Sequence, residues 1–257
     1  MTASEIPITV IILSRNRPLY LWACLDSLYR HNNYPVRFIL VDNQSTDPGV
    51  KEVVRGFSRR KMFERVEWHQ SNDPKRVLEA VRRYRGGPSD YIVVIESDVM
   101  MFDSSPCWLS RMVSLMDKNP ELGVLGSYVD GTDFISKEEA SDLIPGAADA
   151  DISNLIKAKS SERSLALVPP EEEVIDPFNP PGRLIMARKT ALNKLVFATD
   201  GEIYKHAKKL GIQVGIATGV RHRHLSLLNA YDYPDYDTKA RNEFFKNNAV
   251  GVPIVTN

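Results

Sequence analysis

The chain has 257 residues, of which 43% are hydrophobic and 26% charged, and its 33 basic side chains equal its 33 acidic ones, so its formal charge is zero. This composition excludes a disordered, collagen-like or disulfide-stapled chain, and the length is sufficient for a sizeable core. A neutral total argues against a broad cationic surface for nucleic acid, so no nucleic-acid partner is predicted.

The N-terminal residues carry no basic segment followed by an apolar one, and no apolar run is long enough to span a bilayer. We therefore predict a cytoplasmic protein without a transmembrane segment, for which peripheral contact with a membrane stays open. Cys24 and Cys107 lie far apart in the sequence and are predicted to be reduced, small residues of the core.

The first half of the chain alternates short apolar runs with amphipathic stretches. Buried strands are predicted at residues 8–13, 38–41 and 91–95, and a further strand at 66–68. Helices are predicted from Pro18, from Pro48 behind an Asp47 cap, and from Asp73 to about Tyr84. Strands and helices that alternate at this spacing indicate an α/β fold, with a mainly parallel central sheet flanked by helices.

The second half continues this pattern less regularly. The predicted elements are a helix over 106–118 with Ser105 as its cap, strands at 124–128, 183–187 and 212–217, and a helix over 200–210. Residues 130–182 are interpreted as an elaborated loop region of the same domain. We therefore predict a single domain over residues 1–257.

Polar clusters follow three of the predicted strands, at residues 14–17, 42–43 and 96–98. Right-handed crossovers place the ends of parallel strands at one edge of the sheet, so we expect these clusters to converge there. Two carboxylates, Glu96 and Asp98, end the fourth strand, and such a pair can hold a hard divalent cation. The alternative is that both are solvated loop positions.

The segments PITVIILSRNRPLYLWACLDSL, VRFILVDNQSTD and DYIVVIESDV resemble the N-terminal half of family 2 glycosyltransferases. In that family the second strand ends in Asp-Asp or Asp-Asn before Ser-Thr-Asp, and the fourth ends in an Asp-x-Asp motif. The resemblance covers residues 6–130 and implies the GT-A fold, a Rossmann-like fold of nucleotide-diphospho-sugar transferases. It also implies a nucleotide-binding half at about 1–128 and an acceptor-binding half at about 129–257, whose C-terminal tail, rich in Tyr and Asp, would form a lid.

The resemblance assigns the nucleotide to the polar strand ends. Asp42 matches the carboxylate that contacts the base or ribose, and the loop from Ser14 to Asn16 would line the nucleotide. Arg15 stands where the family often has a tyrosine that stacks on uracil, so the base of the donor, a UDP- or GDP-sugar, stays open. Asn72 is either a base contact or a turn residue. The residues predicted to bind the nucleotide-sugar are therefore Ser14, Arg15, Asn16, Asp42, Asn72 and Ser97.

The resemblance places a metal ion, Mn²⁺ or Mg²⁺, on Glu96 and Asp98, although the family usually has Asp where Glu96 stands. A histidine often completes the site in the family, and His222 fits its spacing. Residues 222 and 224 share one face of a strand, so His224 is the alternative ligand.

Asp200 matches the catalytic base of the family, which takes the proton of the acceptor hydroxyl. The other interpretation of Asp200 is that it caps the helix that follows. Glu202 is the alternative base.

The resemblance thus implies metal-dependent transfer of a sugar from a nucleotide-sugar donor to a hydroxyl of a glycan or glycoconjugate acceptor, with inversion. A retaining mechanism, a nucleotide-sugar-binding protein without turnover and a nucleotidyltransferase are the alternatives. Four acidic side chains would gather at this site, so we expect the metal-free site to be locally negative and to need a cation before a diphosphate binds. They are Asp42, Glu96, Asp98 and Asp200.

Overall fold

The computed structural model describes residues 6–130, 173–176, 183–196 and 200–225, together with a few isolated residues between 136 and 150. The tail proposed as a lid, and most of the region interpreted as an elaborated loop, lie outside the described residues. Within the described part of the chain, no helix is both long and apolar enough to cross a bilayer.

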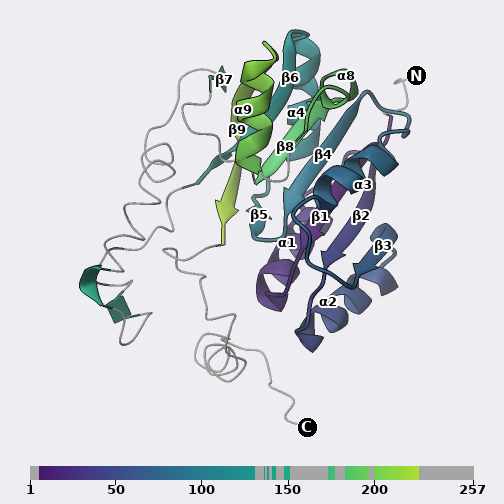
Figure 1. The fold of residues 1–257 in the computed structure, drawn as a ribbon, viewed down its shortest axis with the longest axis vertical. Helices are drawn as coiled ribbons and strands as arrows, with labels where there is room; N and C mark the ends of the chain where they lie inside the picture. The colour runs from purple at the N-terminus through teal and green to yellow at the C-terminus, as the bar shows by residue number, and fades with distance from the viewer. Residues whose placement is uncertain are drawn as a thin grey trace.

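The described residues form a central sheet of nine strands, in the order β3-β2-β1-β4-β8-β6-β9-β5, with β7 paired to β9 (Figure 1). Its strands are β1 Ile8–Ser14, β2 Val36–Asn43, β3 Phe63–His69, β4 Tyr91–Glu96, β5 Val99–Met101, β6 Leu122–Val129, β7 Val174–Ile175, β8 Leu184–Arg188 and β9 Gln213–His224.

The first four strands are parallel to one another, as the βαβ pattern predicts. The second half of the sheet is mixed, because β8 runs antiparallel between β4 and β6, and β5 and β7 run antiparallel to β9. Among the described strands of this half, only β6 and β9 are parallel to each other. The predicted α/β fold with a central sheet is confirmed. The predicted parallel pairing holds for the half of the sheet that contains β1 to β4, whereas most pairings in the other half are antiparallel.

Helices cover both faces of this sheet (Figure 1). They are α1 Pro18–Arg30, α2 Pro48–Arg59, α3 Arg76–Tyr84, α4 Trp108–Lys118, α8 Lys189–Leu192 and α9 Asp200–Lys209. The core on one face takes its helical side chains from α1, α2 and α4, and the core on the other takes them from α3, α8 and α9. Alternate residues of β1 serve the two cores, Val10 and Ile12 on the first and Ile11 on the second, which explains the unbroken apolar run.

Local signals account for the starts of α1 and α2, whereas the helix predicted from Asp73 begins three residues later, at Arg76, behind an N-cap residue, Lys75, that makes no side-chain cap hydrogen bond. Pro18 opens α1, and the carboxylate of Asp47 caps α2 by accepting a hydrogen bond from the N–H of Gly49 at 2.8 Å. The predicted cap of α4 at Ser105 is wrong: the helix begins at Trp108, because its N-cap residue Cys107 has an extended backbone. The thiols of Cys24 and Cys107 are both free and buried, as predicted.

Candidate functional site

Three polar strand ends meet at one edge of the sheet. Ser14 at the end of β1 pairs with Asp42 at the end of β2, and Leu13 of β1 pairs with Glu96 at the end of β4. The N–H of Ser97 donates a hydrogen bond of 3.0 Å to the carbonyl of Leu13, which ties the loop after β4 to β1. The convergence expected from the sequence is therefore present.

Asp98 lies at the centre of this edge and is buried, with 8% of its surface exposed. Its Oδ2 lies 3.4 Å from Nε2 of His224, 3.6 Å from Nη1 of Arg17 and 3.9 Å from Nη1 of Arg183. Burial raises the pKa of Asp98, but the hydrogen bond from His224 and the charges of His224, Arg183 and Arg17 outweigh it and hold the pKa well below its usual range. Its Oδ1 is buried and accepts no hydrogen bond from any described residue.

Glu96 is held by Arg183, a residue that the sequence did not single out. Nη1 of Arg183 donates to Oε2 of Glu96 at 2.5 Å, and the carbonyl of Arg183 accepts the N–H of Glu96 at 2.9 Å. Because β4 and β8 are antiparallel and pair Ile95 with Leu184, the residue before β8 stands directly opposite the residue that ends β4. The expectation of a locally negative site is therefore wrong at Glu96 and Asp98, where guanidinium groups already offset the carboxylates.

The two histidines share a buried face of β9 but have different partners. His224 approaches Asp98, because its strand pairs it with Val99, the next residue along the chain. His222 is fully buried, and its Nδ1 lies 2.7 Å from Oγ of Ser127. Among the residues that the structure describes, no three His, Cys, Asp or Glu side chains gather as a metal site, so Glu96, Asp98 and His222 do not form a preassembled trio.

The predicted nucleotide residues Asn16 and Asp42 join two loops of this edge. Asp42 accepts hydrogen bonds from the N–H and the Oγ of Ser45, at 2.8 and 2.5 Å. The N–H of Asn16 donates to the same Oγ at 2.7 Å, while its Oδ1 accepts the N–H groups of Thr46 at 2.8 Å and Asp47 at 3.2 Å. Asn16 has a φ of 54°, a left-handed conformation that asparagine tolerates better than most residues.

Asn72 has the contacts of a turn residue. Its Oδ1 accepts from Nδ2 of Asn43 at 2.9 Å, and its N–H donates to Oε1 of Gln44 at 2.9 Å, so it fastens the loop after β3 to the end of β2. Of the other predicted nucleotide residues, Ser97 is buried, and Ser14 is buried with an Oγ that has no hydrogen-bond partner among the described residues. Arg15 is exposed at the edge of the sheet.

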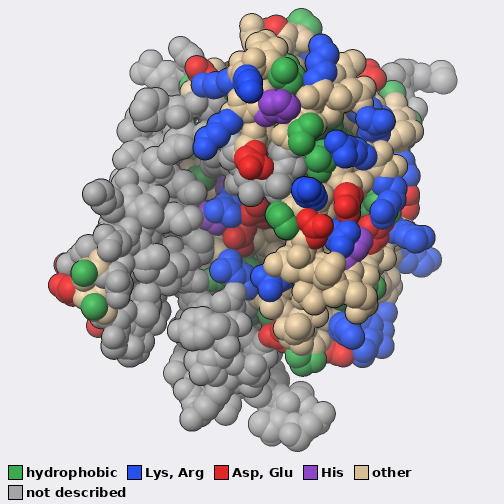
Figure 2. Space-filling model, viewed as in Figure 1, with side chains coloured by type: hydrophobic (Ala, Val, Ile, Leu, Met, Phe, Trp, Pro, Cys, Tyr) green, Lys and Arg blue, Asp and Glu red, His purple; other side chains and the backbone are tan. Residues whose placement is uncertain are grey.

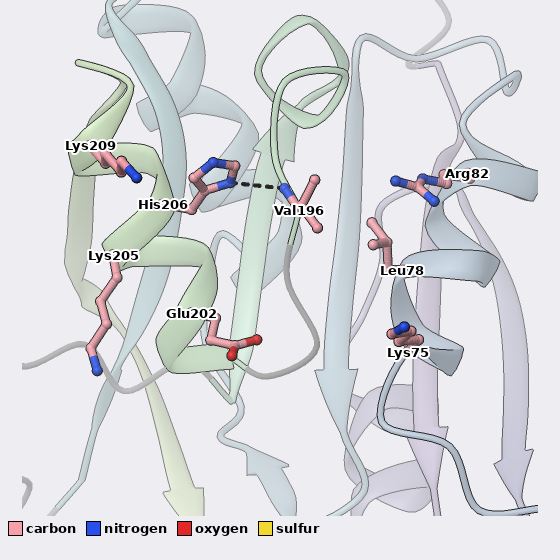
Figure 3. Close-up of a pocket in the computed structure, with 8 residues that line it drawn as sticks. All are labelled: Lys75, Leu78, Arg82, Val196, Glu202, Lys205, His206 and Lys209. Carbon is pink, nitrogen blue, oxygen red and sulfur yellow. Dashed lines mark hydrogen bonds between the residues drawn. The ribbon is translucent and has the colours of Figure 1, made fainter.

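Asp200 is the first residue of α9, and its side chain lies outside the described residues. Glu202, the alternative base, lines a groove of about 530 Å³ between α3 and α9 on one face of the sheet (Figure 3). The cationic side chains of this groove are Lys75, Arg82, Lys205 and Lys209. Acidic and basic side chains are interspersed over the same face of the molecule (Figure 2). None of the predicted nucleotide or metal residues lines this groove.

Several solved structures with a similar fold are GT-A glycosyltransferases. One is the mannosyltransferase PcManGT from Pyrobaculum calidifontis in complex with GDP-Man and Mn²⁺, with a TM-score of 0.56 at 16% identity over 85% of this chain and 56% of its own. Another is glucosyl-3-phosphoglycerate synthase from Mycobacterium tuberculosis with Mn²⁺, UDP and glucosyl-3-phosphoglycerate, with a TM-score of 0.52 at 16% identity over 86% and 72%. GalNAc-T7 with UDP, GalNAc and Mn²⁺ has a TM-score of 0.59 at 10% identity over 94% and 48%.

These likenesses show that the chain has the GT-A fold, and the chain spans about half the length of PcManGT and of GalNAc-T7. The model of Glycosyl transferase family 2 matches residues 9–160, more than half of the chain, and the chain belongs to this family. No curated protein matches it in sequence.

Proposed function

We propose that this protein transfers a sugar from a UDP- or GDP-sugar to a hydroxyl of a glycan or glycoconjugate, with inversion and with the help of Mn²⁺ or Mg²⁺. The observation that carries this proposal is the buried carboxylate of Asp98 at the converging strand ends of a family 2 chain. The similar solved structures contain UDP or GDP-Man together with Mn²⁺, which supports this donor class. A cytoplasmic location and peripheral membrane contact stay predictions.

The residues present fit a hard divalent cation. Oδ1 of Asp98 is buried and accepts no hydrogen bond from the described residues, and carboxylate oxygens are the ligands that such ions prefer. Asp98 and Glu96 would hold the ion, with a histidine of β9 as the nitrogen ligand; His224 is the one beside Asp98. When bound, the ion would neutralise charge on the diphosphate leaving group.

The chain's own residues would bind and orient the nucleotide-sugar and deprotonate the acceptor hydroxyl. The loop from Ser14 to Asn16, with Asp42, would position the nucleoside, and the hydrogen bonds that join these loops would keep that surface in place. Asp200 at the start of α9 would take the proton of the acceptor hydroxyl as its oxygen bonds to the anomeric carbon. The bond between that carbon and the diphosphate breaks in the same step, and the nucleoside diphosphate leaves.

A binding protein without turnover is the second candidate. The observation that favours it is the ion pairing of Glu96 and Asp98 with Arg183, since a site already neutralised by arginine could accept a diphosphate with no cation. Release of UDP or GDP from a nucleotide-sugar separates the two functions, because only the transferase produces it.

Thermal unfolding in the presence of UDP, GDP, UDP-glucose or GDP-mannose, with Mn²⁺ or with EDTA, tests the proposal. A ligand at 100 times its Kd stabilises the protein by about 2.7 kcal/mol, which raises the Tm of a chain of this size by about 5–10 °C. We expect such a shift with Mn²⁺ in the wild type and in Asp26→Asn, where the carboxylate lost belongs to a surface pair with Arg30. Asp98→Asn should lose it, and an undiminished shift in that variant would contradict the proposal.

A further inference from the structure

The guanidinium of Arg183 lies against the acidic end of β4. It precedes β8, and the β4–β8 ladder holds its backbone opposite Glu96 through the hydrogen bond from the N–H of Glu96. Its guanidinium lies 2.5 Å from Oε2 of Glu96 and 3.9 Å from Oδ2 of Asp98, so one side chain bridges both carboxylates.

Both carboxylates of this cluster have cationic partners without a metal. Glu96 pairs with Arg183, and Asp98 lies near Arg183, Arg17 and His224. Nη1 of Arg17 lies 3.6 Å from Oδ2 of Asp98. A divalent cation that binds these carboxylates would have to compete with guanidinium groups for the same oxygens.

Arginine suits a second ligand as well as a carboxylate. Its planar fork of N–H donors binds phosphate oxygens in the same bidentate manner. The side chain of Arg183 is 24% exposed and that of Arg17 is 40% exposed, so both are partly open to solvent. A guanidinium displaced from Glu96 would therefore find a partner in an incoming diphosphate.

We propose that Arg183 neutralises Glu96 and Asp98 in the metal-free protein and passes to the diphosphate of the donor when a cation binds these carboxylates. This inference rests on the proposed function. Its consequence is that metal and nucleotide bind cooperatively, because the diphosphate binds the guanidinium that competes with the metal for these carboxylates.

Mn²⁺ binding to wild type and to Arg183→Met, first alone and then with UDP or GDP, tests the inference. Electron paramagnetic resonance of free Mn²⁺ reports the metal affinity, and calorimetry reports the affinity of the nucleotide for the Mn²⁺-loaded protein. We expect Arg183→Met to bind Mn²⁺ alone about tenfold more tightly and the nucleotide about tenfold more weakly. Tighter Mn²⁺ binding together with weaker nucleotide binding shows that Arg183 competes with the metal, because the loss of a merely structural residue would weaken the binding of both.

Arg37→Met is the matched control, because Arg37 makes an equally short pair with Glu64, at 2.5 Å, between β2 and β3. It should leave both affinities unchanged, and Arg183→Lys, which keeps the charge, should bind Mn²⁺ alone less tightly than Arg183→Met. Unchanged or weaker Mn²⁺ binding by a folded Arg183→Met would overturn the inference while leaving the proposed function intact. A wild type whose nucleotide binding does not respond to Mn²⁺ would instead overturn both.

Discussion

Replacing Asn16 tests how the loops at the sheet edge are joined. Its Oδ1 accepts the N–H groups of Thr46 at 2.8 Å and Asp47 at 3.2 Å, and its φ is 54°. In Asn16→Ala both N–H groups lose this acceptor, at a cost of about 1–2 kcal/mol because water reaches the loop. Alanine adds about 1 kcal/mol for the left-handed conformation. We therefore expect the free energy of unfolding to fall by about 2–3 kcal/mol.

Two companion variants separate these contributions. Asn16→Gly adopts the left-handed conformation without strain but lacks the hydrogen-bond acceptor. The greater conformational entropy of glycine in the unfolded chain offsets part of the stability that the relief of strain provides. It should be about 0.5–1 kcal/mol more stable than Asn16→Ala. Asn16→Asp keeps an acceptor and tolerates the same φ, so it should remain within about 1 kcal/mol of the wild type. Urea unfolding measures all three, and an Asn16→Ala protein as stable as the wild type would refute the reasoning.

Two further predictions concern side-chain hydrogen bonds. Ser127→Ala removes the hydroxyl that lies 2.7 Å from Nδ1 of the buried His222 and should lower the free energy of unfolding by about 1–2 kcal/mol. Urea unfolding measures this change, with Ala at an exposed serine as the control. An unchanged free energy of unfolding in Ser127→Ala would contradict the prediction. Burial raises the pKa of Glu67, but hydrogen bonds from Tyr84 and Arg83 outweigh it and lower the pKa below its ordinary value. The ionised carboxylate of Glu67 therefore stabilises the fold at pH values above its unfolded-state pKa, and this stabilisation is lost as the pH falls through its folded-state pKa. Glu67→Gln should accordingly be destabilising by about 1 kcal/mol at neutral pH and by less in acid. Thermal unfolding at several pH values checks this, and a difference from the wild type that grows in acid would show that the sign is wrong.

The fold was predictable because its signals are local. Continuous β-branched runs mark the strands buried on both faces, and Pro18 and Pro48 mark the helix starts that follow. The end of β4 at Glu96 could also be located, since the apolar run stops there. Each of these features depends on neighbours a few residues away in the chain.

The partners of the acidic residues could not be predicted in the same way. Arg183 reaches Glu96 only because β8 returns antiparallel to β4, a pairing across 87 residues of sequence. The spacing of the two histidines showed that they share a face, but the pairing of β9 with β5 decides that His224 lies beside Asp98. Strand register across the sheet therefore determines which charges meet at this site.

Turnover of a nucleotide-sugar donor is tested most directly by the release of UDP or GDP from nucleotide-sugars, with water or a panel of glycans as acceptor. We predict release that requires Mn²⁺ or Mg²⁺, stops with EDTA and falls at least about 100-fold in Asp98→Ala, since metal stabilisation of the leaving group is worth several kcal/mol. Asp26→Ala, at the surface pair with Arg30, should retain the wild-type rate. Release by Asp98→Ala at the wild-type rate, or none from any UDP- or GDP-sugar by the wild type, would contradict a metal-dependent glycosyltransferase with its centre at Asp98.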